Sequence, residues 1–179
     1  MKRRSIVTAV VAGAAVAAGI GWSLRERYGL LGRGDRGGDD IDRLLWTQRF
    51  EQPDGGRLVM AERRGKPLLL NLWASWCAPC VREMPVLDRF QREHRNGGWQ
   101  VVGLAIDALE PVRRFLAAVP VDFPIGLAGI SGIELAHSLG NAGGQLPFSV
   151  VFDAKGAIRA RKLGVVEPAA LSRWVAEIG

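Results

Sequence analysis

Residues 68–80 read LLLNLWASWCAPC, and this stretch decides the fold. Its first six residues are an apolar run typical of a buried strand, and a helix is expected to begin at the cysteines. A helix N-terminus offers unpaired N–H groups and a partial positive charge, which stabilise a thiolate. Cys77 and Cys80 are the only cysteines among the 179 residues. The sequence therefore predicts a redox-active thiol pair.

Two other interpretations of the cysteine pair are weaker. A structural disulfide that spans two residues removes little entropy from the unfolded chain and so stabilises little. A structural zinc ion needs about four ligands, and the chain has no second cysteine pair, while His94 and His137 lie far apart in the sequence. We therefore expect no metal site and interpret both histidines as structural or surface residues.

The N-terminal segment predicts the compartment. Three basic residues, 2–4, precede twenty uncharged and mostly apolar residues, 5–24. Such a run is long enough for a helix across a bilayer of about 30 Å. A cleaved signal peptide is the alternative, because residues 15–17, AVA, fit a small-residue cleavage pattern. The run continues past that point and favours an uncleaved signal anchor over residues 1–28. In a bacterium the rest of the chain would then lie on the periplasmic side of the inner membrane.

Beyond the anchor, composition suggests a tether followed by one domain. Residues 29–46 begin with a charged, glycine-rich stretch and are expected to form a flexible linker. Residues 47–179 suffice for one compact domain. The net charge is +6, but residues 1–28 hold five Lys or Arg and one Glu, so the remainder carries only +2. We see no basic stripe and expect no nucleic-acid partner.

Strand-like and helical stretches alternate within the domain, which predicts an α/β fold with a mixed central sheet flanked by helices. The last two strands are joined by a short turn and must pair antiparallel. The expected strands and extended pieces are residues 57–61, 68–73, 100–106, 123–127, 148–152 and 157–163. The expected helices run from the cysteines to about residue 95 and over residues 109–119, 132–139 and 168–178.

This order of elements around W-C-x-x-C resembles the thioredoxin fold, and it is close to the membrane-anchored TlpA/ResA group of bacterial thiol–disulfide oxidoreductases. Residues 71–77, NLWASWC, resemble the group's approach strand, and residues 80–85, CVREMP, its active-site helix. Residues 144–148, GQLPF, resemble the loop that carries the family's cis-proline. The resemblance covers residues 47–179. It implies a thioredoxin fold with an N-terminal β-hairpin extension and a central α/β insertion over residues 107–139.

The residues and the resemblance together suggest three catalytic roles. Cys77 is expected to be the attacking thiolate and Cys80 the resolving thiol. Plain thioredoxins carry a buried Asp six residues before the first cysteine, where this chain has Asn71, and an amide cannot take up a proton. The group resembled has a Glu on its active-site helix, and Glu83 matches it. Glu83 lies about one helical turn beyond Cys80.

If Glu83 is partly buried with a raised pKa, it can take the proton from Cys80. The alternative is a solvated helix carboxylate or an ion-pair partner of Arg82 or Arg113.

Five further residues complete the predicted site. Trp76 is expected to form an apolar docking surface, with simple packing as the alternative. The resemblance implies that Pro147 is cis and presents the backbone of Leu146 to a substrate strand. Ala78 and Pro79 form the spacer between the cysteines, where Pro79 removes one backbone N–H and stiffens the helix start.

The resemblance implies a protein-disulfide oxidoreductase that works as a reductase outside the cytoplasm, without a cofactor, and receives electrons from a membrane thiol carrier. Family substrates include apocytochrome c thiols awaiting haem and the copper-site cysteines of respiratory oxidase. A thiol peroxidase is one alternative, but its reactive cysteine follows a Thr-x-x-Cys pattern, and Ala74 occupies the Thr position here. A copper-delivery protein is the other, but such relatives space their cysteines by three residues and add a distant His.

Overall fold

The computed structural model describes residues 42–178. The expected signal anchor, 1–28, and most of the expected linker, 29–46, lie outside the described residues. The last five residues of that linker form a short π-helical turn, η1 (Asp42–Trp46). Leu45 and Trp46 are buried in it, so the packed domain begins a few residues before residue 47. Within residues 42–178, no helix is long and apolar enough to span a bilayer.

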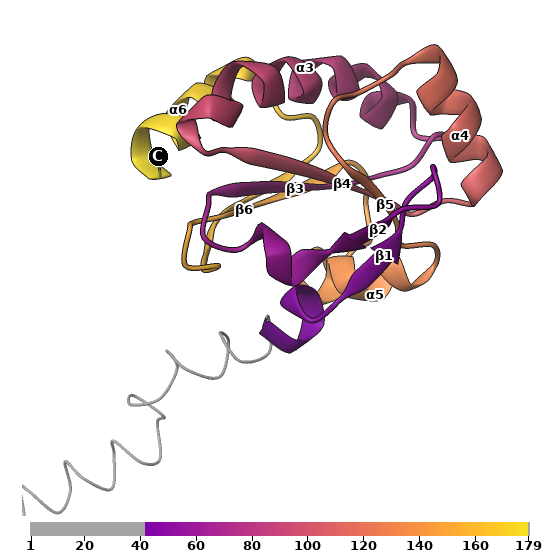
Figure 1. Ribbon diagram of the computed structural model, residues 1–179, viewed down its shortest axis with the longest axis horizontal. Helices are drawn as coiled ribbons and strands as arrows, with labels where there is room; N and C mark the ends of the chain where they lie inside the picture. Colours follow the sequence, from indigo (N-terminus) through magenta and orange to yellow (C-terminus); the bar gives the residue numbers. More distant parts are fainter. Residues whose placement is uncertain (1–41, 179) are drawn as a thin grey trace, which may run out of the picture. The chain divides into compact units, whose positions relative to one another are not determined.

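One seven-stranded mixed sheet organises the domain, with the strand order β2-β1-β5-β4-β3-β6-β7 (Figure 1). The three central strands β5, β4 and β3 run parallel, and every other pair of neighbours is antiparallel. The strands are β1 (Arg49–Glu51), β2 (Arg57–Val59), β3 (Leu68–Trp73), β4 (Gln100–Ala105), β5 (Ile125–Leu127), β6 (Phe148–Phe152) and β7 (Ile158–Leu163).

Helices cover both faces of the sheet. Figure 1 shows α3, α4 and α6 above it and α5 with the N-terminal turn below. The helices are α3 (Ala78–His94), α4 (Leu109–Ala118), α5 (Ser131–Ser138) and α6 (Pro168–Ile178), with short 3₁₀ segments η2 (Met60–Arg63) and η3 (Arg95–Gly97). The expected α/β class, the mixed sheet and the flanking helices are confirmed.

The N-terminal hairpin implied by the resemblance is present as β1 and β2, and its turn is closed by the Gln52 N–H donating to the Gly56 carbonyl at 2.8 Å. The strand expected over residues 57–61 ends at Val59, because the chain turns into η2. In that turn Met60 becomes fully buried. The insertion between β4 and β6 holds α4, β5 and α5.

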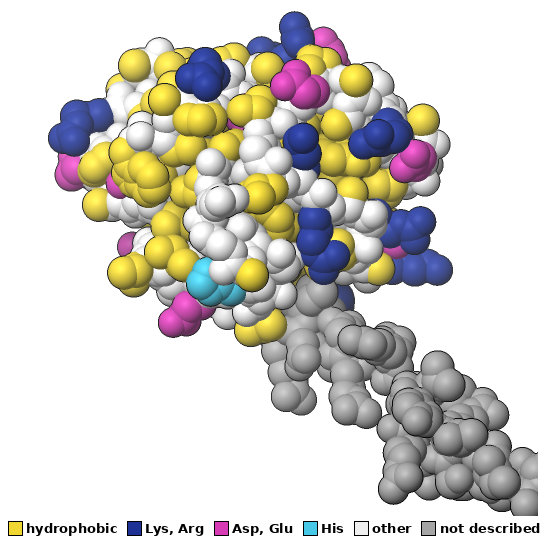
Figure 2. Space-filling view, turned by 180° about the vertical axis from the view of Figure 1, so that it is seen from behind, with side chains coloured by type: hydrophobic (Ala, Val, Ile, Leu, Met, Phe, Trp, Pro, Cys, Tyr) yellow, Lys and Arg dark blue, Asp and Glu magenta, His cyan; other side chains and the backbone are white. Residues whose placement is uncertain are grey.

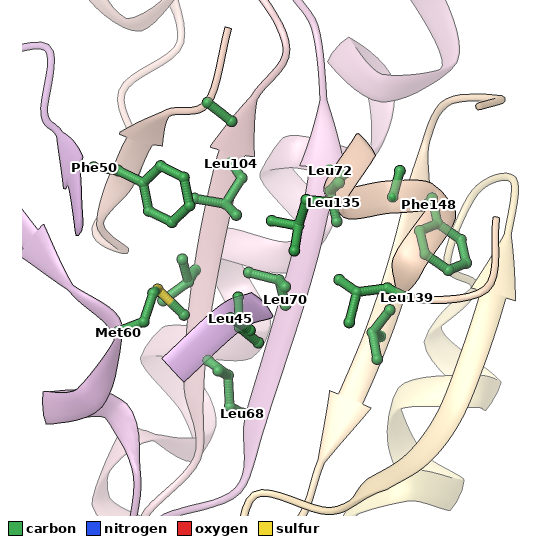
Figure 3. Packing of buried hydrophobic residues seen from close by; sticks show 14 of the residues in the cluster. Leu45, Phe50, Met60, Leu68, Leu70, Leu72, Leu104, Leu135, Leu139 and Phe148 are labelled. Carbon is green, nitrogen blue, oxygen red and sulfur yellow. The ribbon is translucent and has the colours of Figure 1, made fainter. Parts of the chain in front are cut away.

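Alternation along the strands divides the core into two apolar clusters. In β3, Leu68, Leu70 and Leu72 point to the face covered by α5 and η1, and Figure 3 shows this cluster. Leu69 and Trp73 point to the opposite face, where α3, α4 and α6 pack. Because side chains alternate across a strand, Asn71 also points to the α3 face. A buried amide thus stands in the middle of an apolar surface.

On the face of the domain that Figure 2 shows, charged side chains form no single large patch. In Figure 2, Lys and Arg side chains lie singly or in small groups among acidic and apolar side chains. The two cysteines lie instead at the edge of the sheet where β3 ends.

Candidate active site

The two cysteines form a disulfide at the N-terminus of α3, with their Cα atoms 5.3 Å apart. Cys77 is the N-cap residue of the helix, and its Sγ accepts a hydrogen bond from the Cys80 N–H at 3.3 Å. Cys77 is 7% exposed and Cys80 is fully buried. The helix N-terminus thus favours a thiolate at the outer sulfur, and Cys77 is the more accessible residue, as expected.

The turn that presents Cys77 is anchored to the neighbouring strand. The Cys77 N–H donates to the Ala74 carbonyl at 3.2 Å and closes this turn. Asp107, two residues after β4, accepts from the Ser75 N–H at 2.9 Å and from the Ser75 hydroxyl at 2.6 Å. We predicted a role for neither Asp107 nor Ser75 from the sequence. The available signal was an acidic residue at the carboxyl end of the strand next to β3.

Glu83 is fully buried on the inner face of α3. Its Oε1 accepts from Asn71 Nδ2 at 2.6 Å, and its Oε2 accepts from the Val166 N–H at 2.8 Å. Burial raises the pKa of this carboxyl group above its usual value of 4.5, and the hydrogen bonds from Val166 and Asn71 oppose that rise. The alternative of a solvated carboxylate is therefore wrong. Arg113 instead contacts Pro53 and Glu110 at the surface.

Asn71 connects Glu83 to the neighbouring strand β6. Asn71 and Ser149 are direct partners in the β3–β6 register. Asn71 Nδ2 also donates to Ser149 Oγ at 3.0 Å. The other end of the amide, Oδ1, is buried and has no hydrogen-bond partner among the described residues. Sequence analysis missed Ser149, although a single hydroxyl inside the apolar run 148–152 was a visible signal.

The residues expected to meet a substrate lie at the same edge of the sheet. Trp76 is 70% exposed, so the packing alternative is wrong for it. The Leu146–Pro147 peptide bond is cis. The Pro147 carbonyl accepts from the Gly164 N–H at 2.9 Å, which joins this loop to the end of β7. Leu146 is half-buried and its loop approaches β6 directly opposite the end of β3.

The remaining predicted residues have simpler settings. Ala78 and Pro79 fill the first turn of α3, with Ala78 exposed and Pro79 half-buried. His94 packs its ring on Phe90, with ring centroids 4.7 Å apart. His137 is exposed. Within the part of the chain that the structure describes, no group of three or more His, Cys, Asp or Glu side chains could hold a metal ion.

Comparison with known proteins identifies a matching family and several relatives. The Redoxin family profile matches residues 48–176. The chain is 27% identical over 112 residues to the thiol-disulfide oxidoreductase ResA of Bacillus cereus, and this match spans 62% of each chain. It is 29% identical over 151 residues to the thioredoxin-like protein YneN of Bacillus subtilis, across 82% of each chain.

Among solved structures, a thiol:disulfide interchange protein of the thioredoxin family from Chlorobium tepidum matches with a TM-score of 0.65 and 26% identity. That match covers 75% of this chain and 94% of that one. The likeness confirms the thioredoxin-like fold. The alignment spans less than two thirds of the length of ResA.

Proposed function

The chain belongs to the Redoxin family, and we propose that it is a protein thiol–disulfide oxidoreductase. One observation carries this proposal. The only two cysteines of the chain lie at the N-terminus of α3, bonded to each other, with Cys77 slightly exposed and Cys80 fully buried. One accessible sulfur that can be attacked and one protected sulfur that can resolve are what dithiol exchange requires.

In the proposed reaction, the Cys77 thiolate of the reduced protein attacks one sulfur of a substrate disulfide. The substrate S–S bond breaks, one substrate thiolate leaves, and a mixed disulfide forms through Cys77. The Cys80 thiol then loses its proton and attacks Cys77 Sγ. The mixed disulfide breaks, the second substrate thiolate leaves, and the Cys77–Cys80 disulfide forms. Two electrons have passed from the protein to the substrate.

Glu83 serves as the proton acceptor for Cys80 in this proposal. It lies one helical turn after Cys80 on the buried side of α3. Its raised pKa supports the role, because a base that titrates nearer to neutral pH can both accept and return a proton. Asn71 holds the carboxylate on the side that faces the core.

Trp76 and the loop at Leu146 and Pro147 form the proposed docking surface. A tryptophan that is 70% exposed beside the reactive cysteine offers apolar area to a protein partner. The loop before β6 lies at the same edge of the sheet and would offer the Leu146 backbone to an extended segment of the substrate. Ala78 and Pro79 shape the helix start between the cysteines.

We further propose that the protein acts as a reductase outside the cytoplasm. Residues 1–28 would anchor it in the bacterial inner membrane, residues 29–46 would tether the domain, and a membrane thiol carrier would supply electrons. Its likeness to ResA, a thiol-disulfide oxidoreductase, supports the exchange activity, and the family resemblance of the sequence implies apocytochrome c or an oxidase copper site as the substrate. A fusion of alkaline phosphatase to residue 40, active only outside the cytoplasm, tests the orientation.

The thiol peroxidase alternative has less support from the site. The residue three before Cys77 is Ala74, a buried methyl side chain where the peroxidase pattern needs a hydroxyl. Peroxide consumption by the reduced protein, measured beside disulfide reduction, separates the two activities. A copper titration of the reduced protein tests the copper-delivery alternative.

The direction of electron flow is tested by the redox equilibrium of the protein against glutathione. We expect the Cys77–Cys80 pair to be more reducing than glutathione, with catalysed reduction of insulin disulfides when a dithiol regenerates the protein. A pair that is more oxidising than glutathione would contradict the reductase proposal and indicate disulfide formation instead.

A further inference from the structure

The buried amide of Asn71 is bonded at one end only. Its Nδ2 donates to both Glu83 Oε1 and Ser149 Oγ, while Oδ1 has no hydrogen-bond partner among the described residues. An unpaired buried polar atom is costly. This arrangement satisfies a Glu83 carboxylate, which accepts hydrogen bonds at both oxygens. It does not suit a Glu83 protonated at Oε1, because the acid O–H would face an N–H donor, and protonation at Oε2 would instead place the acid O–H against the Val166 N–H.

Turning the amide by half a rotation reverses this situation. Oδ1 would then face Glu83 Oε1 and accept its acid proton. Oδ1 would also face the Ser149 hydroxyl, which can donate as well as accept. The nitrogen and oxygen of an amide are nearly equal in size, so the rotation exchanges these two atoms without displacing the side chains around them. Each orientation leaves one amide atom unpaired and satisfies a different protonation state of Glu83.

We infer that Asn71 is a positioning residue whose side-chain amide turns over each time Glu83 gains or loses a proton, with the Ser149 hydroxyl reversing its hydrogen bond in step. This inference rests on the proposed role of Glu83 as a base. Asn71 and Ser149 together let the Glu83 carboxyl group change between its two protonation states without losing its hydrogen bond. A buried Asp at position 71 would instead add a second titrating group.

The surroundings of Glu83 contain few other groups that could set its protonation. On its own helix the groups nearest in sequence are Cys80, which titrates only when the disulfide is reduced, and Arg82, which is exposed. From β3 and β6 the facing polar side chains are Asn71 and Ser149. From the segment before α6 the contact is the Val166 N–H, and the adjacent Glu167 is exposed. The amide is therefore the neutral partner best placed to follow the proton.

The rotation of the Asn71 amide accompanies both half-reactions of thiol–disulfide exchange. When Cys80 attacks the mixed disulfide, its thiol proton passes to a Glu83 oxygen, the Cys77–substrate bond breaks and the substrate thiolate leaves. The amide turns and Oδ1 accepts from the new acid. The protein with the Cys77–Cys80 disulfide has the amide nitrogen facing Glu83, so the acid then releases its proton to solvent and the amide turns back. When a dithiol donor later reduces the disulfide, Glu83 takes up a proton from solvent, passes it to Cys80 and becomes a carboxylate again. Protons and electrons balance over the two half-reactions.

Nuclear Overhauser contacts of the Asn71 side-chain amide protons in the wild-type protein test the turn directly. Above the Glu83 midpoint, these protons should lie against the Ser149 side chain, and this contact should disappear below it. Asn141 is an internal control in the same spectrum. Its amide is bonded at both ends to the Gln145 backbone, through Nδ2 at 2.8 Å and Oδ1 at 3.3 Å. Its contacts should not change with pH.

A kinetic test uses Asn71→Leu, which has similar volume and no hydrogen-bonding atoms. The reduced protein is mixed with one equivalent of an aromatic disulfide whose thiolate is coloured, so that attack by Cys77 and resolution by Cys80 appear as two phases. We expect the pH midpoint of the second phase to rise by about one unit, because the hydrogen bond that the variant removes from the ionised carboxylate is stronger than the one it removes from the neutral acid. The pH midpoint of the first phase should be unchanged. A general loosening of β3 would not leave it unchanged.

Three outcomes decide between the possibilities. An Asn71–Ser149 contact that persists on both sides of the Glu83 midpoint overturns the turning amide. An unchanged second-phase midpoint in Asn71→Leu overturns the positioning role. A second-phase pH midpoint that is lost in Asn71→Leu but persists in Glu83→Gln would show that Glu83 is not the base. The proposed function would then fail at Glu83 rather than at Asn71.

Discussion

Glu83 Oε1 lies 2.6 Å from Asn71 Nδ2, and both side chains are fully buried although they are twelve residues apart in the chain. Glu83 occupies a position on α3 between Cys80 and Met84, where an apolar side chain would otherwise pack against the sheet. A carboxyl group there is costly unless it is hydrogen-bonded. The structure provides two donors for it, which is consistent with a carboxyl group retained for proton transfer.

The first prediction concerns stability against pH for Glu83→Gln. Burial raises the folded-state pKa of Glu83 above the unfolded value of about 4.5. Between these two values the folded protein binds more protons than the unfolded chain, so the free energy of unfolding falls as pH rises through this window. The Gln variant lacks this titration. Urea unfolding across a pH series should give a smaller fall for Glu83→Gln than for the wild type.

Parallel stability curves for the two proteins would show that the Glu83 pKa is not raised. The Gln side chain offers one acceptor and one donor and therefore resembles the neutral acid. We expect Glu83→Gln to fold at low pH with nearly wild-type stability.

The second prediction concerns Trp76. Its side chain is 70% exposed, so Trp76→Ala should change the free energy of unfolding by no more than about 0.5 kcal/mol. The KM for a protein disulfide should nevertheless rise about tenfold, the effect of losing one aromatic contact at an interface. Steady-state reduction of insulin measures this. Trp76→Phe is the conservative control and should retain most of the affinity.

A small disulfide such as oxidised glutathione makes little use of a docking surface. We expect Trp76→Ala to reduce it at nearly the wild-type rate. An equal loss on both substrates would mean that Trp76 acts on the cysteines and not on docking.

The third prediction concerns Asp107, whose carboxylate holds the turn before Cys77 through the Ser75 N–H and hydroxyl. Asp107→Ala removes both contacts and should slow the first phase of thiolate release, the attack by Cys77, by about fivefold. Ser75→Ala removes only the hydroxyl contact and should have a smaller effect. Stopped-flow absorbance at one pH measures both. A first phase as fast as in the wild type would exclude this positioning role.

The fourth prediction concerns the packing of β5. A Cβ atom on Gly126 would lie 2.8 Å from Phe50 Cβ and 2.9 Å from side-chain carbons of Leu104 and Leu58. Gly126→Ala should therefore destabilise the fold by about 1–3 kcal/mol. Gly97→Ala is the matched control, because no atom lies within 4 Å of its added Cβ. Chemical unfolding of both variants tests the difference, and equal stability would contradict the tight contact between the hairpin and the parallel strands.

Much of the fold follows from local pattern. The apolar run 68–73 and the run 148–152 became β3 and β6 with the predicted bounds, and residues 168–178 became α6. These segments carry strong periodic or continuous apolar signals. The strand predicted over 57–61 ends two residues early, because tertiary packing buries Met60 in a 3₁₀ turn. No local pattern encodes that turn.

Some residues of the candidate site could likewise be predicted from the local sequence, and others could not. Cys77, Cys80 and Glu83 were accessible to sequence analysis, since they belong to one motif and one helix. Ser149 and the Val166 N–H were not, because they reach Asn71 and Glu83 from positions 78 and 83 residues away. Those contacts depend on the register between β3 and β6 and on the path of the chain into α6. A backbone donor such as Val166 leaves no signal in its side chain.

In the proposed reaction, Cys77 attacks a substrate disulfide and Cys80 resolves the mixed disulfide. The most direct test incubates Cys80→Ser and Cys77→Ser with a protein disulfide and identifies adducts by intact mass under non-reducing conditions. We expect Cys80→Ser to accumulate a mixed disulfide through Cys77 and Cys77→Ser to accumulate little, because Cys80 is fully buried. An adduct on Cys77→Ser with none on Cys80→Ser would contradict it.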